Sequence, residues 1–232
     1  MLSVIGIIGA MDEEIQLYKE GMHDITETMV AGITYYSGTL NGKEVVLCKC
    51  GVGKVNASIC TQILIQQFQV KDVIFTGVAG ALNPNLDIGD IVVSTDCQYH
   101  DMDVTALGFK KGEIPFSPKS IFKADERLVR MAVEASEEVV EGKTLTGRIL
   151  SGDQFVASRE LVKSLHEDMQ GDCTEMEGAA VAHVCDANQI PFVIVRSMSD
   201  KADGSAHINF PEFTVLASKR SYEIVSSMLP HL

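Results

Sequence analysis

The chain alternates short apolar runs with longer stretches in which apolar residues recur at helical spacing. The runs predict strands over residues 4–8, 45–48, 73–76, 90–94, 147–151 and 192–196. Between and after them lie three apolar stripes: Val55, Ile59 and Ile63; Leu128, Ala132, Ala135 and Val139; and Phe213, Leu216, Ala217 and Ile224. Apolar strands separated by amphipathic helices predict a largely parallel sheet covered on both faces.

One segment has a different pattern. In YYSGTLNGKEVVLC, residues 35–48, a turn-forming SGTLNGK joins two strand-like runs, so we expect a hairpin and hence a mixed sheet. The sequence contains no internal repeat and no linker, and residues 110–120 are the longest loop-like piece. The prediction is an α/β fold with three αβα layers, in which residues 1–232 form one domain.

Composition and charge narrow the classes of partner. With 46% hydrophobic and 22% charged residues the chain is typical of a folded globular protein. The apolar runs are too short for a membrane span, and the first residues resemble a strand more than a signal peptide. The net charge of −13, with basic residues scattered among acidic ones, argues against nucleic acid. A small ligand without net charge fits best.

The cysteines and histidines give no metal-binding pattern. The six cysteines include no C-x-x-C pair, and several lie in apolar stretches, which favours buried thiols in a reducing cytoplasm. His100 has acidic neighbours but no second ligand at suitable spacing, and His183 lies in an apolar helix, where a packed core residue is expected. We therefore expect neither a metal nor another cofactor.

Three familiar ligand-binding or catalytic motifs are incomplete or absent. The stretch GVGKVNAS, residues 51–58, lacks the first glycine and the final Ser or Thr of a phosphate-binding P-loop, and indicates a strand-to-helix turn. No G-x-G-x-x-G supports a dinucleotide site. Ser151 lacks the G-x-S-x-G elbow of serine hydrolases.

Acidic residues lie next to three apolar segments. Asp12, Glu13 and Glu14 come directly after the first strand, where they could simply favour a helix N-terminus or could include a functional carboxylate. Glu177 opens a helix that is apolar nearly all round, and Asp200 follows the strand at 192–196. If these strand ends meet at one edge of the sheet, the acids would perturb one another's pKa values, as acid–base chemistry requires.

A set of motifs spanning nearly the whole chain resembles one family. The chain is similar to the bacterial 5′-methylthioadenosine/S-adenosylhomocysteine nucleosidases of the nucleoside phosphorylase superfamily. The motifs are, in order, GAMDEE, GVGKVNA, TGVAGAL, DIVVS with YHDMDVTALG, SGDQF, EMEGAAVAHV and VRSMSDKAD. The resemblance implies a homodimer with a mixed sheet that hydrolyses an N-glycosidic bond and releases adenine.

The resemblance also implies roles for the acids. Glu14 would activate the attacking water, and Asp200, beside Ser199, would protonate the purine at N7. Glu177 would bind the ribose hydroxyls and stabilise positive charge on the sugar. These roles suit cleavage through an oxocarbenium-like sugar. Asp200 would need a pKa near 7 in place of the usual ~3.9 to serve efficiently as the acid.

Further pocket residues follow from the same resemblance. Phe155 and Val156 would hold adenine, partly through backbone hydrogen bonds, and Glu175 and Met176 would adjoin the ribose. A loop over residues 100–115, including Leu107 and Pro115, would reach the neighbouring subunit's site. The remaining pocket residues would be Met11, Val52, Ala79, Gly80, Arg196 and Phe210.

Two positions depart from the family pattern. Val78 stands where relatives often have Ser, and Leu107 stands where they often have an aromatic residue, which leaves the preferred 5′ substituent open.

Two other functions remain alternatives. A nucleoside phosphorylase would need an anion site where this chain places M-D-E-E. A receiver-type regulatory module would use an acid–lysine pair such as Asp200 and Lys201, but is typically about half this length.

Overall fold

The computed structural model describes residues 3–201 and 206–232, and the side chains of the last helix from residue 213 onward. Its strands are β1 (Ile5–Gly9), β2 (His23–Val30), β3 (Ile33–Leu40), β4 (Lys43–Lys49), β5 (Asp72–Ala81), β6 (Ile91–Tyr99), β7 (Ile121–Lys123), β8 (Thr144–Ser151), β9 (Gly171–Glu175) and β10 (Phe192–Asp200). Its α-helices are α1 (Asp12–Gly21), α2 (Lys54–Phe68), α3 (Glu126–Val139), α4 (Arg159–Glu167), α5 (Gly178–Asn188) and α6 (Ala206–Met228). Short 3₁₀ turns cover Thr105–Leu107 and Leu229–His231.

All the strands belong to one mixed sheet, as the sequence predicted. β5 lies at its centre, parallel to β1 and β10 and antiparallel to β9. Because β10 also pairs with β6, and β6, β8 and β9 lead back to β5, these strands close into a ring, while β4, β3 and β2 extend the sheet beyond β1. The closure brings the ends of β5, β9 and β10 together.

The predicted hairpin is confirmed. β3 and β4 pair antiparallel with Leu40 opposite Lys43, and Asn41 and Gly42 form the turn with φ of 49° and 78°. Positive φ at both central residues is the geometry of the tight hairpin turn whose twist matches that of the strands.

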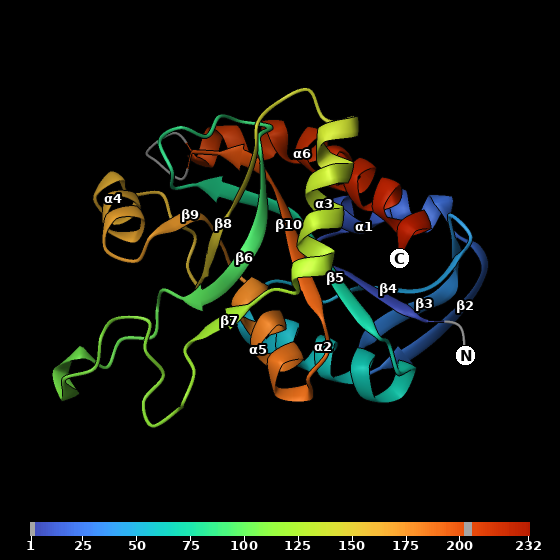
Figure 1. The fold of residues 1–232 in the computed structure, drawn as a ribbon, viewed down its shortest axis with the longest axis horizontal. Helices are drawn as coiled ribbons and strands as arrows, with labels where there is room; N and C mark the ends of the chain where they lie inside the picture. The colour runs from blue at the N-terminus through green and yellow to red at the C-terminus, as the bar shows by residue number, and fades with distance from the viewer. Residues whose placement is uncertain (1–2, 202–205) are drawn as a thin grey trace.

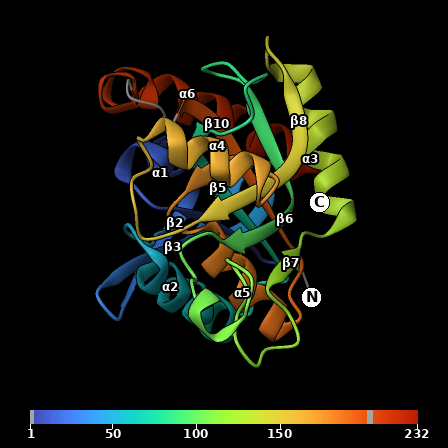
Figure 2. The ribbon, with the colours of Figure 1, turned by 90° about the vertical axis from the view of Figure 1, so that its left-hand side faces the viewer.

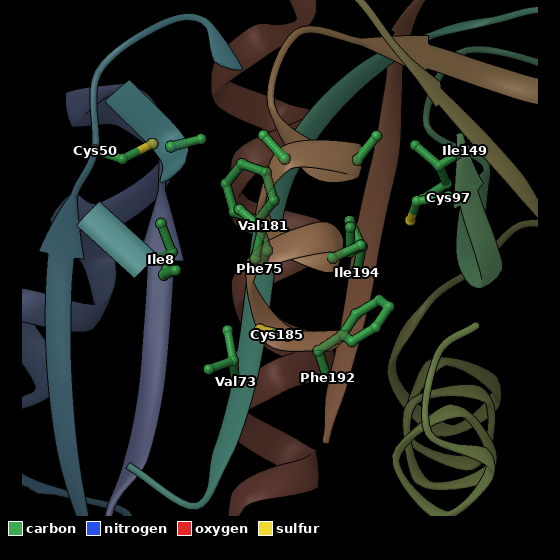
Figure 3. Close-up of a cluster of buried hydrophobic side chains, with 14 of the residues drawn as sticks. Ile8, Cys50, Val73, Phe75, Cys97, Ile149, Val181, Cys185, Phe192 and Ile194 are labelled. Atoms are coloured by element: carbon green, nitrogen blue, oxygen red, sulfur yellow. The ribbon is translucent and has the colours of Figure 1, made fainter. Parts of the chain in front are cut away.

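Helices cover both faces of the sheet, which gives the predicted three layers (Figures 1 and 2). On one face α2 and α5 enclose the larger core; Figure 3 shows Val181 and Cys185 of α5 among side chains from the strands, including Phe75 and Ile194. On the other face α1, α3 and α6 enclose a second core that includes Tyr18 and Leu128. Among the described residues, none of the helices is both long enough and apolar enough to cross a membrane.

The apolar stripe predicted along α2 faces outward at Val55 and Ile59, whereas its third residue, Ile63, packs against the core. Val55 is 69% exposed and Ile59 is 42% exposed, whereas Ala57, Cys60 and Leu64 face the sheet. The prediction of a helix is correct, but the stripe marks its buried face only in part. α2 is apolar on two sides, so spacing alone could not distinguish the side that packs on the sheet from the side that remains outside.

Candidate active site

One cavity lies where β1, β5, β9 and β10 end. Segments from all along the chain contribute to its wall. The lining residues are Ala10, Met11, Glu14, Val52, Val78, Ala79, Gly80, Gln154, Phe155, Val156, Thr174, Glu175, Met176, Glu177, Ser199 and Asp200. The three acids that lie next to apolar segments therefore converge on one cavity.

Glu14 occupies the position that an anion would take at the start of α1. Its carboxylate accepts hydrogen bonds from the backbone N–H groups of Ala10 at 2.6 Å, Met11 at 3.0 Å and Val78 at 3.0 Å. Burial raises the pKa of Glu14, against the opposing effects of Arg196 and of these backbone donors. Asp12 and Glu13 are exposed, so of the three consecutive acids only Glu14 reaches the cavity.

Arg196 connects the buried carboxylates from behind the cavity. Its guanidinium forms a hydrogen-bonded ion pair with Glu175 and lies 3.8 Å from Glu14 and 4.0 Å from Glu177. Burial by itself lowers the pKa of Arg196, but the three carboxylates outweigh burial and the pKa is raised. The guanidinium thus remains a cation that balances part of the negative charge.

Gly77 makes room for this arrangement. The residue has a φ of 151°, and a Cβ at this position would collide with both the Glu14 carboxylate and the Arg196 guanidinium. Gly77 follows the predicted strand at 73–76. It permits close approach of two charged side chains to the backbone.

Several hydrogen-bond partners fix the side chain of Glu175 in place. Besides Arg196, it accepts hydrogen bonds from the Ser151 hydroxyl and from the backbone N–H groups of Glu177 at 3.2 Å and Gly178 at 2.9 Å. Ser151 in turn accepts from the N–H of Ala179 at 2.7 Å. Ser151 therefore orients a carboxylate at the start of α5 and is not a nucleophile.

Glu177 is placed differently, at the N-cap position of α5 and on the cavity wall. Its carboxylate accepts one hydrogen bond from the N–H of Gly53 at 2.7 Å. Burial and the neighbouring Glu175 raise the pKa of Glu177 to about 8, although Arg196 and the Gly53 donor act in the opposite direction. Glu177 is thus buried, as predicted for this stretch, but retains acceptor capacity toward the cavity.

Asp200 ends β10 at a break in the strand register. Met198 pairs with Ala79 and Asp200 with Gly80, so Ser199 is the extra residue of a bulge. Ser199 donates a hydrogen bond to the Asp200 carboxylate at 2.9 Å and lies 3.4 Å from the carbonyl of Ala79. Asp200 is 3% exposed and borders the cavity.

The predicted site residues fall into three groups. Those that line the cavity are Met11, Glu14, Val52, Ala79, Gly80, Phe155, Val156, Glu175, Met176, Glu177, Ser199 and Asp200. Arg196 stands behind the wall, and Leu107 and Pro115 lie on the segment between β6 and β7, away from it. The side chain of Phe210 lies outside the described residues.

Sequence reasoning missed several residues of the site. Gln154 and Thr174 line the cavity, Ser151 orients Glu175, and Gly77 accommodates the buried ion pair. No local pattern could have indicated that Gly77 contacts Glu14 and Arg196.

The fold and site define a member of the phosphorylase superfamily: the model of that family matches residues 4–230, so the chain belongs to it. A 5′-methylthioadenosine/S-adenosylhomocysteine nucleosidase of Actinobacillus succinogenes is 44% identical over 230 residues, which is 98% of this chain and 99% of the relative. The crystal structure of the Neisseria meningitidis nucleosidase of that name, in complex with methylthio-immucillin-A, has a TM-score of 0.95 at 38% identity and full coverage of both chains.

A further similar structure carries a different name. The futalosine hydrolase of Helicobacter pylori has a TM-score of 0.94 at 35% identity, covering 100% of this chain and 99% of its own. Both names describe hydrolases, within a superfamily named for phosphorolysis. The choice between water and phosphate must therefore be made from the geometry of the site itself.

Proposed function

We propose that this protein is a nucleosidase that hydrolyses the N-glycosidic bond of 5′-methylthioadenosine and S-adenosylhomocysteine, releasing adenine and the corresponding 5-thioribose. The observation that carries the proposal is the carboxylate of Glu14, seated on the N–H groups of Ala10, Met11 and Val78. A group that accepts these hydrogen bonds occupies the natural anion site at a helix N-terminus. The names of the full-length relatives agree with this substrate class.

The same contacts argue against a phosphorylase. A phosphate dianion entering the cavity would meet the side chain of Glu14, which already occupies the backbone donors beside α1. Arg196, the one cation among the described residues next to the three carboxylates, is neutralised by them and is 1% exposed. Water carries no charge and is not repelled by this surface.

The reaction follows from the positions of three carboxyl groups. Glu14 takes a proton from water as the water oxygen bonds to the anomeric carbon. The C–N bond breaks with its electron pair moving to the purine, and Asp200 delivers a proton to N7, so that adenine leaves neutral. Glu177 also lies on the cavity wall, where it binds ribose hydroxyls. In its ionised form it stabilises the transient positive charge of the sugar.

Residues that line the cavity fit the purine ring and the 5′ substituent of such a substrate. Phe155 is 49% exposed and Val156 is buried, so one can cover a purine ring and the other can pack against it. Met11, Val52 and Met176 supply an apolar wall for an alkylthio group.

A homodimer completes the proposal. α2 and the preceding turn carry Val52, Val55 and Ile59, which are 49%, 69% and 42% exposed, and Val52 also lines the cavity. Contiguous exposed apolar surface of this kind is typical of a protein interface. Lys54 pairs with Asp101 at 2.5 Å and ties this face to the segment that contains Leu107 and Phe116, which are 71% and 92% exposed. A partner chain seated here would border the cavity.

The setting and domain organisation are proposed on the same basis. The six cysteines are free and buried, as suits a protein of the reducing cytoplasm. One continuous sheet joins strands from residue 5 to residue 200, which supports a single domain over 1–232.

The test of the central proposal is product analysis: purified protein should release adenine from 5′-methylthioadenosine at the same rate with and without phosphate. Adenine release that requires phosphate and yields a sugar 1-phosphate would overturn it.

A further inference from the structure

Thr174 carries a buried hydroxyl on the cavity wall that has no partner within the described part of the chain. The residue is 5% exposed and lines the cavity, and its Oγ1 makes no hydrogen bond to any described residue. A buried hydroxyl without a partner costs free energy. Of the buried polar side-chain atoms in this condition in residues 3–201 and 213–232, it is the one that belongs to a residue lining this cavity.

The sheet register places Thr174 in line with Asp200. Thr174 of β9 pairs with Gly80 of β5, and Gly80 pairs with Asp200 of β10. Residues directly opposite each other across neighbouring strands project on the same face of a sheet. Two strand spacings separate Thr174 from Asp200, about 10 Å, and the residue between them has no side chain.

This row forms a slot with a flat floor. Gly80 leaves the sheet bare between the hydroxyl of Thr174 and the carboxyl of Asp200, and Val156 lies beside the slot, in the same apolar cluster as Leu150, the other neighbour of Thr174. Glu175, the next residue along β9, points the other way toward Arg196. The slot therefore lies on the face of β9 opposite to the Glu175–Arg196 ion pair, within the same cavity, and suits a flat ring with polar edges.

We propose that the hydroxyl of Thr174 hydrogen-bonds a ring nitrogen of the leaving purine, on the edge opposite to the one that Asp200 protonates. The hydroxyl is buried at the cavity wall without a partner among the described residues, so an acceptor seated over Gly80 would satisfy it. Adenine presents N1 and N3 as acceptors away from N7, and a threonine hydroxyl can donate to either. Thr174 is thus a specificity-determining residue, and the inference rests on the proposed function.

The consequence is selectivity for the base. Asp200 alone would recognise any purine with a free N7, whereas a second contact on the opposite edge requires a nitrogen acceptor at a defined place. A site built to hydrogen-bond a particular group rejects analogues that lack it, because the buried polar group is then left unpaired.

The test combines Thr174→Val, which removes the hydroxyl at nearly constant shape, with Thr174→Ser, which retains it. Calorimetry measures the binding of adenine, 1-deazaadenine, 3-deazaadenine and 7-deazaadenine to each protein. We expect Thr174→Val to weaken adenine binding about 5-fold and Thr174→Ser to bind nearly as the unmodified protein does. The 5-fold loss should persist with 7-deazaadenine and vanish with either 1-deazaadenine or 3-deazaadenine.

A merely structural role for Thr174 gives a different result. In that case Thr174→Val would weaken all four bases equally, or none of them, and either result would overturn the inference. If the unmodified protein bound no adenine at all, the proposed function itself would fail. The two failures are therefore distinguished by the unmodified protein alone.

Discussion

The carboxylate of Glu14 lies 3.8 Å from the guanidinium of Arg196, and their side chains are 2% and 1% exposed. The two residues come from opposite ends of the chain, one after β1 and the other within β10. Their proximity affects the pKa of Glu14: burial favours the protonated form, and Arg196 together with the backbone donors favours the carboxylate. In the proposed reaction, the raised pKa would make Glu14 a stronger base than a solvated glutamate.

Gly77 tests whether this contact matters for catalysis. We expect Gly77→Ala to reduce turnover at least about 100-fold, because the new Cβ collides with both Glu14 and Arg196. The matched control is Gly42→Ala, which also introduces a side chain at positive φ, in the β3–β4 turn, but meets no atom within 4 Å. Steady-state kinetics and thermal unfolding of both variants separate the effects. Equal losses of turnover in the two variants would show that backbone strain, and not the buried pair, is responsible.

The raised pKa of Glu177 predicts how stability depends on pH. The folded protein keeps a proton on Glu177 up to a pKa of about 8, whereas the unfolded chain loses it near the usual 4.5. The stabilisation from this group is therefore fully present below about pH 4.5 and lost as pH rises through about 8. Glu177→Gln should flatten the fall of Tm over that window.

The control for this experiment is Glu134→Gln, which changes an exposed glutamate of α3. It should leave the pH dependence of Tm unchanged. Parallel pH profiles for Glu177→Gln and the unmodified protein would contradict the assignment of a buried, proton-retaining Glu177.

The exposed face of α2 predicts the assembly. Val55→Glu places a charge in the proposed interface, so we expect it to shift the protein from dimer to monomer and to lower its specific activity. Val215→Glu is the control, since Val215 is 68% exposed and Val55 is 69% exposed, each on a helix. Light scattering after size-exclusion chromatography gives the mass. A Val55→Glu protein that remains dimeric and fully active would place the interface elsewhere.

Asp200 is expected to matter in proportion to the leaving group's need for a proton. Asp200→Asn should lower turnover of 5′-methylthioadenosine about 100- to 10,000-fold, the usual range for a lost general acid. With the corresponding 6-chloropurine riboside, whose electron-poor base leaves more readily, the loss should be clearly smaller. Asp87→Asn, at an exposed ion pair with Lys201, is the control and should behave as the unmodified protein does. Equal losses for both substrates would contradict the role of an acid.

Much of the fold could be predicted because buried strands appear in the sequence as short apolar runs. Each of the six apolar runs lies in or overlaps a strand, and the Asn41–Gly42 turn follows from residue chemistry. β2 escaped notice because it is a largely exposed edge strand, with residues such as Asp24 and Glu27 that carry no apolar signal. The stripe on α2 marked its buried face only in part because apolar residues lie on more than one side of that helix.

The site was predictable only in part for a similar reason. Acids next to apolar segments marked Glu14, Glu177 and Asp200, because strand ends collect at one edge of the sheet. The partners that tune them are set by three-dimensional contacts. Arg196 bridges carboxylates from three elements, and Gly77 is needed only because those side chains meet above it.

The most direct test of the account is the comparison of Glu14→Gln with Glu13→Gln, neighbours of which one is buried in the cavity and the other is exposed. Adenine release from 5′-methylthioadenosine would be measured for both, with and without phosphate. The account predicts that Glu14→Gln loses at least about 100-fold in turnover under both conditions while still binding adenine, and that Glu13→Gln is unaffected. Near-normal turnover in Glu14→Gln, or turnover restored by phosphate, would contradict the claim that Glu14 activates water in place of a bound anion.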